Sequence, residues 1–197
     1  MSDTLRAPCA YQEEIKKSRF AAHAAPVAGV AEAMAFFAQH SDPAATHNCW
    51  AYRIGQAYRF HDDGEPGGTA GRPILQAIEG QGLDRVAVLV TRWFGGIKLG
   101  AGGLVRAYGG CAAQCLRLGS REPIIETALV ACRCAYGELP LFKARLAQAG
   151  AAVQAEAFDA DGVALTLSVP RAALAELERT AADVTRGRAH WQVRDAG

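Results

Sequence analysis

The feature that most constrains the fold is an apolar run that leads directly into a glycine-rich basic segment. Residues 86–90 are apolar at every position and rich in valine. A run without polar alternation is typical of a strand buried on both faces of a sheet. The following segment, residues 91–103, contains five glycines. Beyond it, apolar residues recur at helical spacing at Leu104, Tyr108, Cys111, Cys115 and Leu118. The pattern predicts a strand, a loop and a helix in succession.

The loop of this unit has the chemistry of an anion site. Backbone N–H groups and the positive end of the helix dipole converge at a helix N-terminus, and glycine lets a ligand approach the backbone closely. From Arg85 to Arg121, both included, there are six basic residues and no acidic one. We predict phosphate or RNA contacts at Arg92, Gly95, Gly96, Lys98, Gly100 and Arg106. The spacing matches no nucleotide fingerprint, and one alternative stays open, in which the glycines only make tight turns and allow close packing.

A second glycine-rich segment, residues 61–73, precedes the apolar strand. Its candidate site residues are His61, Asp62, Asp63, Glu65, Gly67, Gly68 and Thr69. Carboxylates of this kind bind Mg²⁺ or transfer protons, but Asp and Gly also build turns whose side chains bond their own backbone. The spacing lacks the regularity of a calcium loop, which favours the turn. We therefore assign no metal site and no cofactor, and keep Mg²⁺ as the alternative.

Composition and cysteine spacing exclude several classes of protein. The net charge of +1 argues against a globally basic nucleic-acid binder, so any polyanion site must be local. None of the six cysteines stands in a CxxC motif, and we expect buried thiols rather than a zinc site. Cys49, near His47 and His61, is treated in the same way, and no catalytic residue is assigned. Without a signal peptide or an apolar run of roughly 18 residues, we expect a cytoplasmic protein without membrane contact.

Glycine is distributed unevenly, which suggests two domains. Fifteen of the 21 glycines lie between Gly55 and Gly119. We predict a first domain over residues 1–123 and a second over residues 124–197. The second is expected to contain strand 127–134, helix 139–149, a hairpin of strands 152–158 and 163–169, helix 171–184 and strand 189–193. This β-α-β-β-α-β order is the ferredoxin-like arrangement. The fold class is therefore α+β.

The first domain is expected to alternate strands with amphipathic helices. Strands are predicted over residues 11–16, 19–25, 47–54 and 57–61, and helices from residue 26 to about residue 40 and around residues 74–78. In the first helix, Val30, Met34 and Phe37 form the predicted core stripe, bordered by Ala33 and Phe36. Trp93 and Phe94 are either core residues or exposed platforms for stacking bases, and strand alternation favours one of each.

Three segments together form a recognisable pattern. They are Cys49-Trp50-Ala51-Tyr52, the run from His61 to Gly71, and the run from Thr91 to Gly100. The combination resembles the IMPACT/YigZ family in its bacterial two-domain form and covers essentially the whole chain. The resemblance implies an N-terminal domain of the ribosomal-protein-like β-α fold, shared with the fourth domain of elongation factor G and with kinases of the galactokinase and homoserine-kinase type. It also implies a ferredoxin-like C-terminal domain similar to the fifth domain of elongation factor G.

The same resemblance suggests a role in translation. Eukaryotic relatives regulate translation initiation under amino-acid starvation by competing for a partner of the responding kinase, using an additional domain that has no counterpart in this sequence. For the bacterial form, the resemblance implies a translation-linked or RNA-binding regulator without an established reaction. We expect RNA or the ribosome as partner and the two glycine-rich loops to meet in space. Two alternatives remain: an enzyme or sensor for a small phosphorylated ligand or nucleotide, assisted by Mg²⁺, and a protein-interaction module. The oligomeric state is not predicted.

Overall fold

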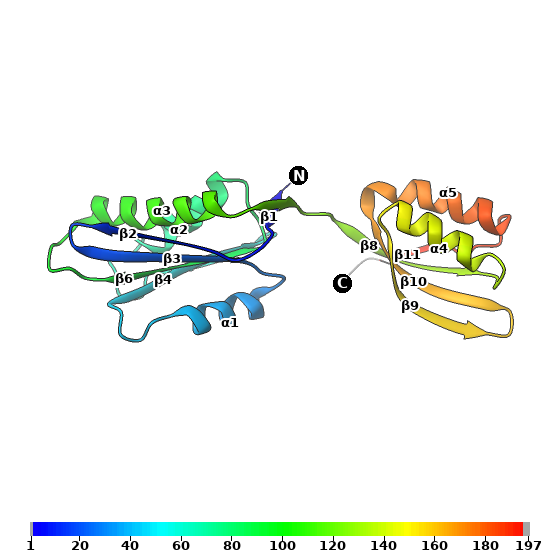
Figure 1. Ribbon diagram of the computed structural model, residues 1–197, viewed down its shortest axis with the longest axis horizontal. Coiled ribbons are helices and arrows are strands. Elements are labelled where there is room, and N and C mark those ends of the chain that lie inside the picture. The colour runs from blue at the N-terminus through cyan, green and yellow to red at the C-terminus, as the bar shows by residue number, and fades with distance from the viewer. Residues whose placement is uncertain (1, 195–197) are drawn as a thin grey trace. The chain divides into compact units, whose positions relative to one another are not determined.

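The computed structural model describes residues 2–194 and divides into two compact units, Met1–Ile124 and Ile125–Gly197 (Figure 1). Both units combine helices with an antiparallel sheet, so the chain is a two-domain α+β protein. Within the described residues, no helix is long and apolar enough to cross a membrane.

The first unit is built on a five-stranded antiparallel sheet in the order β2-β3-β6-β4-β5. Its strands are β2 (Cys9–Ile15), β3 (Ser18–Pro26), β4 (His47–Ile54), β5 (Ala57–His61) and β6 (Val86–Trp93). A short two-stranded sheet joins β1 (Asp3–Leu5) to β7 (Arg121–Pro123). The predicted apolar strand thus lies at the centre of the larger sheet, where neighbouring strands satisfy its backbone on both sides.

Helices cover both faces of this sheet (Figure 1). Helices α2 (Gly71–Gly80) and α3 (Ala101–Leu118) lie on one face, and α1 (Val30–His40) lies on the other. The central strand faces both layers, because Val86, Val88 and Val90 belong to the core under α2 and α3 while Ala87 and Leu89 belong to the core under α1. The prediction of a strand buried on both faces is confirmed.

Two predicted core positions are wrong. Val30 and Met34 are 43% and 39% exposed, whereas Ala33 and Phe36, predicted only as the border of the stripe, are buried. The helix is rotated so that Ala33, Phe36 and Phe37 form its buried face. Leu118 is 66% exposed, since it ends α3 beyond the edge of the core.

The second unit has the predicted β-α-β-β-α-β order. Its elements are β8 (Thr127–Cys134), α4 (Leu139–Gln148), β9 (Ala152–Asp159), β10 (Gly162–Pro170), a 3₁₀ turn (Arg171–Ala173), α5 (Leu174–Thr185) and β11 (Gln192–Arg194). The strands form an antiparallel sheet in the order β11-β8-β10-β9. Phe142 and Leu146 of α4 and Leu177 of α5 share a core with Val130 and Leu165 of the sheet, so both helices cover one face.

Candidate anion-binding surface of the first unit

Several loops come together at one end of the five-stranded sheet. The strand register establishes this, because Arg19 lies opposite Trp93, His47 opposite Arg92, and Trp50 opposite His61. The β2–β3 turn, the β5–α2 loop and the β6–α3 loop therefore share that end, and Figure 1 shows the β2–β3 turn and the β6–α3 loop there. Both glycine-rich segments singled out from the sequence are among them.

A buried ion pair joins the two glycine-rich segments. Arg92 Nη1 donates to Glu65 Oε1 at 2.6 Å, and the two residues are only 5% and 8% exposed. Tyr108 of α3 donates its hydroxyl to the same oxygen at 2.7 Å. His47 Nε2 lies 3.7 Å from it. One carboxylate oxygen thus connects two strands, a loop and a helix, and through it the two segments meet.

Arg92 does not present its charge to solvent, which corrects the prediction that it contacts phosphate. Besides Glu65, its guanidinium reaches Ser18 Oγ at 3.3 Å and lies between the rings of Phe20 and Phe94, 5.6 and 5.4 Å from their centroids. Its Nε is buried without a partner among the described residues. A buried and neutralised guanidinium stabilises the base of the loop and is unavailable to a ligand. The amide of Gly95 is also occupied, since it donates to Ser18 Oγ at 3.3 Å.

The acidic residues of the second loop bind the protein's own backbone. The Asp62 carboxylate accepts hydrogen bonds from the amides of Gly68, Ala70 and Gly71 at 2.8 to 3.0 Å. It therefore satisfies N–H groups at the start of α2 that have no partner within the helix. Asp63 Oδ2 accepts from the amide of Asn48 at 2.6 Å. These contacts are those of the turn alternative described above.

The other predicted residues of this loop lie around that turn. Thr69 is buried and donates its hydroxyl to the Pro66 carbonyl oxygen at 2.6 Å, while Gly67 is exposed. The exposed His61 ring has Nε2 3.7 Å from Asp63 Oδ1. Within residues 2–194, no three His, Cys, Asp or Glu side chains are grouped so that they could hold a metal ion. The polar side chains of Asp62, Asp63 and Thr69 bond to backbone groups of the protein.

The remaining residues of the first loop are open to solvent. Lys98 and Arg106 are exposed, and neither forms an ion pair within the described residues. Gly96 and Gly100 have φ of +87° and +74°, the left-handed region that glycine enters without steric cost. Helix α3 begins directly after Gly100, so its first N–H groups, which have no carbonyl partner in the helix, lie beside these cations.

The structure adds three cations that the sequence reasoning missed. A Cβ on Gly95 would lie 1.8 Å from the Lys17 carbonyl oxygen, so the β6–α3 loop rests directly on the β2–β3 turn. That turn presents Lys16 and Lys17, and the Arg19 guanidinium stacks 3.8 Å above the Trp93 ring. The available signal was a pair of lysines at a hairpin turn, but nothing in the sequence placed that turn beside residue 95. We refer to Lys16, Lys17, Arg19, Lys98 and Arg106 as the basic end.

One aromatic residue of the loop is a surface platform. Phe94 is 47% exposed, and its neighbour Ile97 is 42% exposed. Trp93 is more buried and donates Nε1–H to Asp42 Oδ2 at 3.2 Å. Phe94 is therefore the member of the pair that can offer a ring face to a ligand.

Among the described residues around the Arg92–Glu65 ion pair, no side chain is an activated nucleophile. Burial raises the pKa of the Cys49 thiol well above its ordinary value, and its Sγ donates to the Asp62 carbonyl oxygen at 3.0 Å. Burial likewise raises the pKa of Tyr108, so the phenol remains a neutral donor to Glu65. Both groups serve as hydrogen-bond donors in the core.

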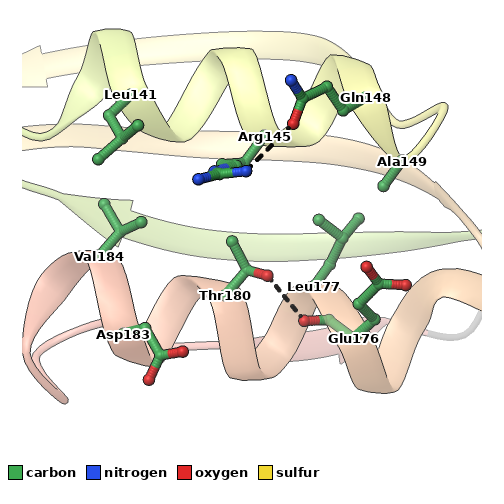
Figure 2. Close-up of a pocket in the computed structure, with 9 residues that line it drawn as sticks. All are labelled: Leu141, Arg145, Gln148, Ala149, Glu176, Leu177, Thr180, Asp183 and Val184. Carbon is green, nitrogen blue, oxygen red and sulfur yellow. Dashed lines mark hydrogen bonds between the residues drawn. The ribbon is translucent and has the colours of Figure 1, made fainter.

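A separate groove lies between the two helices of the second unit. It encloses about 490 Å³. Figure 2 shows Leu141 and Arg145 of α4, and Ala149 directly after it, facing Leu177 and Val184 of α5 across the groove. Arg145 is the one basic residue among those that line it, and Glu176 and Asp183 also line it, so the groove is a poor anion site.

The sequence and the fold both match known proteins. The model of the Impact N-terminal domain matches residues 16–116, and that of a domain of unknown function, DUF1949, matches residues 132–188. A Thermus thermophilus protein described as an IMPACT family member is 50% identical over 179 residues, covering 88% of this chain and 97% of that protein.

More distant similarities extend this result. The Escherichia coli IMPACT family member YigZ is 40% identical over 193 residues, with 92% of each chain covered. The Protein IMPACT of Rattus norvegicus is 37% identical over 93 residues, which is 43% of this chain and 29% of that protein. A crystal structure of a hypothetical protein superposes with a TM-score of 0.76 at 36% identity over the full length of both chains.

Proposed function

The chain belongs to the IMPACT family, and from that premise we propose that it is a translation-linked regulator that binds RNA, free or in the ribosome, through its basic end. Lys16, Lys17, Arg19, Lys98 and Arg106 would contact phosphates, and Phe94 would stack on a base. No catalytic step is part of this function.

The observation that carries the proposal is the unpaired state of these cations. Within residues 2–194 none of the five forms an ion pair, although the nearby carboxylates of Asp62, Asp63 and Glu65 are all hydrogen-bonded. Like charges held together repel one another unless an anion neutralises them. A phosphate backbone supplies that anion, and the counterions that it releases favour binding.

The finer fold assignments form part of the same proposal. The β11-β8-β10-β9 strand order supports a ferredoxin-like second unit like the fifth domain of elongation factor G. The three layers of the first unit support a likeness to the fourth domain. Such a pairing would suit a protein that acts on the ribosome.

The test is RNA binding by the full chain as a function of salt. A labelled single-stranded RNA is titrated with the wild type, with the Lys98→Ala/Arg106→Ala double variant and with Arg117→Ala. Each lost phosphate contact should reduce the slope of log affinity against log salt by about 0.7, so the double variant should lose about twice that value. Arg117 is an exposed cation near the opposite end of α3 and provides the matched control.

Two results would contradict the proposal. One is the absence of binding to RNA or ribosomes by the wild type at low salt. The other is an equal loss of binding in Arg117→Ala and in the double variant, which would indicate non-specific attraction to any cation.

The alternatives receive less support. A Mg²⁺-assisted site for a phosphorylated ligand would need free carboxylates, and those of the β5–α2 loop are occupied. A screen of nucleotides with Mg²⁺ tests it, because a ligand that binds the folded state raises the melting temperature. If the protein is instead a protein-interaction module, its partner would bind in the groove between α4 and α5.

A further inference from the structure

Two cysteines of the first unit, distant in sequence, lie in direct contact. Cys9 is the first residue of β2, and Cys115 lies in the last turns of α3. Their sulfur atoms are 3.8 Å apart. Each thiol also approaches the other residue's carbonyl oxygen, Cys9 Sγ at 3.3 Å and Cys115 Sγ at 3.5 Å. No other pair of cysteines makes a sulfur–sulfur contact within the described residues.

The two thiols have different environments. Cys9 is partly exposed, whereas Cys115 is fully buried. The hydrogen bond from Cys115 lowers the pKa of Cys9, and the same contact, together with burial, raises the pKa of Cys115. The accessible sulfur is therefore the one with more thiolate character, which is the arrangement of a reactive thiol beside a resolving thiol.

Glycine at position 119 packs closely against this site. A Cβ there would lie 3.0 Å from Cys9 Sγ and 2.6 Å from Leu5 Cδ2. A larger residue would therefore press on the Cys9 sulfur, and glycine leaves that sulfur where it meets Cys115. Neither thiol contacts the basic end, which lies at the opposite end of α3, so the site is separate from the proposed RNA surface.

We propose that Cys9 and Cys115 form a modification site, a dithiol that a hydroperoxide oxidises reversibly to a disulfide. The Cys9 thiolate attacks the peroxide, the O–O bond breaks, and Cys9 sulfenic acid and an alcohol or water form once a proton is taken up. Cys115 then attacks the sulfenic sulfur, the S–S bond forms and water leaves. The two sulfurs together lose two electrons, which reduce the peroxide, and a thiol reductant reverses the change.

The disulfide would fasten an edge strand to a helix. β2 is one of the two edge strands of the five-stranded sheet, and its first residue would be joined to the last turns of α3. A crosslink between residues more than a hundred positions apart restricts the unfolded chain strongly. We expect the oxidised protein to melt roughly 5 to 10 °C higher than the reduced protein.

The experiment treats the reduced full chain with hydrogen peroxide and counts free thiols after denaturation. Two of the six thiols should disappear, and peptide mapping should find Cys9 joined to Cys115. Dithiothreitol should restore all six. The mapping is made on the wild type, so the result does not depend on the folding of any variant.

Variants assign the roles of the two sulfurs. In Cys115→Ala, Cys9 should be trapped as a sulfenic acid by dimedone, because no resolving thiol remains. In Cys9→Ser, peroxide should leave Cys115 unmodified. Cys132→Ser is the matched control, since Cys132 is a buried thiol of the second unit whose pKa burial raises to about 12, and it should leave the Cys9–Cys115 linkage intact. Peroxide treatment that leaves all six thiols free, or joins a different pair, would overturn the proposal.

Discussion

The two units use charge in opposite ways. In the first unit, the Arg92–Glu65 pair is buried and binds two loops and a helix together. In the second unit, the ion pairs Arg133–Asp159, Lys143–Glu156 and Arg188–Glu138 all keep at least one partner substantially exposed. A buried pair requires a partner for each charge, whereas an exposed pair exchanges its partner for water at little cost.

This difference supports the proposal that the RNA-binding surface lies at the basic end. Loops are normally the most variable part of a domain. The loops at the basic end, however, are fixed by the buried Arg92–Glu65 ion pair. The free-energy cost of burying Arg92 and Glu65 is understandable if the loops at the basic end must keep one conformation. The second unit shows no comparable buried ion pair among its described residues.

The strongest test of this comparison removes the buried carboxylate. Glu65→Ala leaves the Arg92 guanidinium buried without its main partner, and we expect the free energy of unfolding of the first unit to fall by about 3–5 kcal/mol. Tyr108→Phe removes only one hydrogen bond to the same oxygen and should cost about 1 kcal/mol. Urea denaturation, monitored in each unit by amide hydrogen exchange, measures both losses of stability. Equal losses of stability in Glu65→Ala and Tyr108→Phe would show that the Arg92–Glu65 ion pair adds nothing to the free energy of unfolding.

An intermediate effect is expected where the loop rests on the β2–β3 turn. In Gly95→Ala the new methyl group would overlap the Lys17 carbonyl, so the loop must move, at a cost of about 1–3 kcal/mol. Gly67→Ala is the control, because a Cβ at that position has nothing within 4 Å. The same denaturation measurement applies. If the two variants were equally stable, the contact between the loop and the turn would be absent in solution.

The smallest effect is expected at the surface pair of the second unit. The hydrogen bond from Arg133 lowers the pKa of Asp159 from 3.8 to about 2. Since the folded state binds this proton less readily than the unfolded state, the stability that the pair contributes is present above about pH 4 and is lost as the pH falls toward 2. In Arg133→Ala, the free energy of unfolding should depend less on pH in this range, and it should change little at neutral pH. A profile between pH 2 and 5 that is unchanged in the variant would contradict the assignment.

Much of the fold could be predicted from local pattern. The doubly buried strand at residues 86–90 follows from unbroken apolarity, and the order of elements in the second unit follows from the change between strand and helix periods. The buried face of α1 could not be predicted in this way. Val30 and Met34 fit a helical stripe as well as Ala33 and Phe36 do, and only contact with the sheet selects between them.

The candidate site likewise contains residues that the sequence alone predicts and residues that only the tertiary structure reveals. Lys98, Gly96 and Gly100 were predicted because charge, glycine and a helix start are adjacent in the chain. The burial of Arg92 was missed, because its partner Glu65 is 27 residues away. Lys16 and Lys17 were missed for the same reason, since only strand pairing brings their turn beneath residue 95.

By itself, the amino-acid sequence determined which segments are strands and helices, where the glycine-rich loops lie and to which family pattern they conform. Those properties depend on neighbouring residues, whose spacing sets the period of an element. The tertiary structure decided which charges are neutralised and which remain free, and which thiols touch. Coulomb and hydrogen-bond energies depend on distance in space and on burial, and both are set by the packing of segments far apart in the chain.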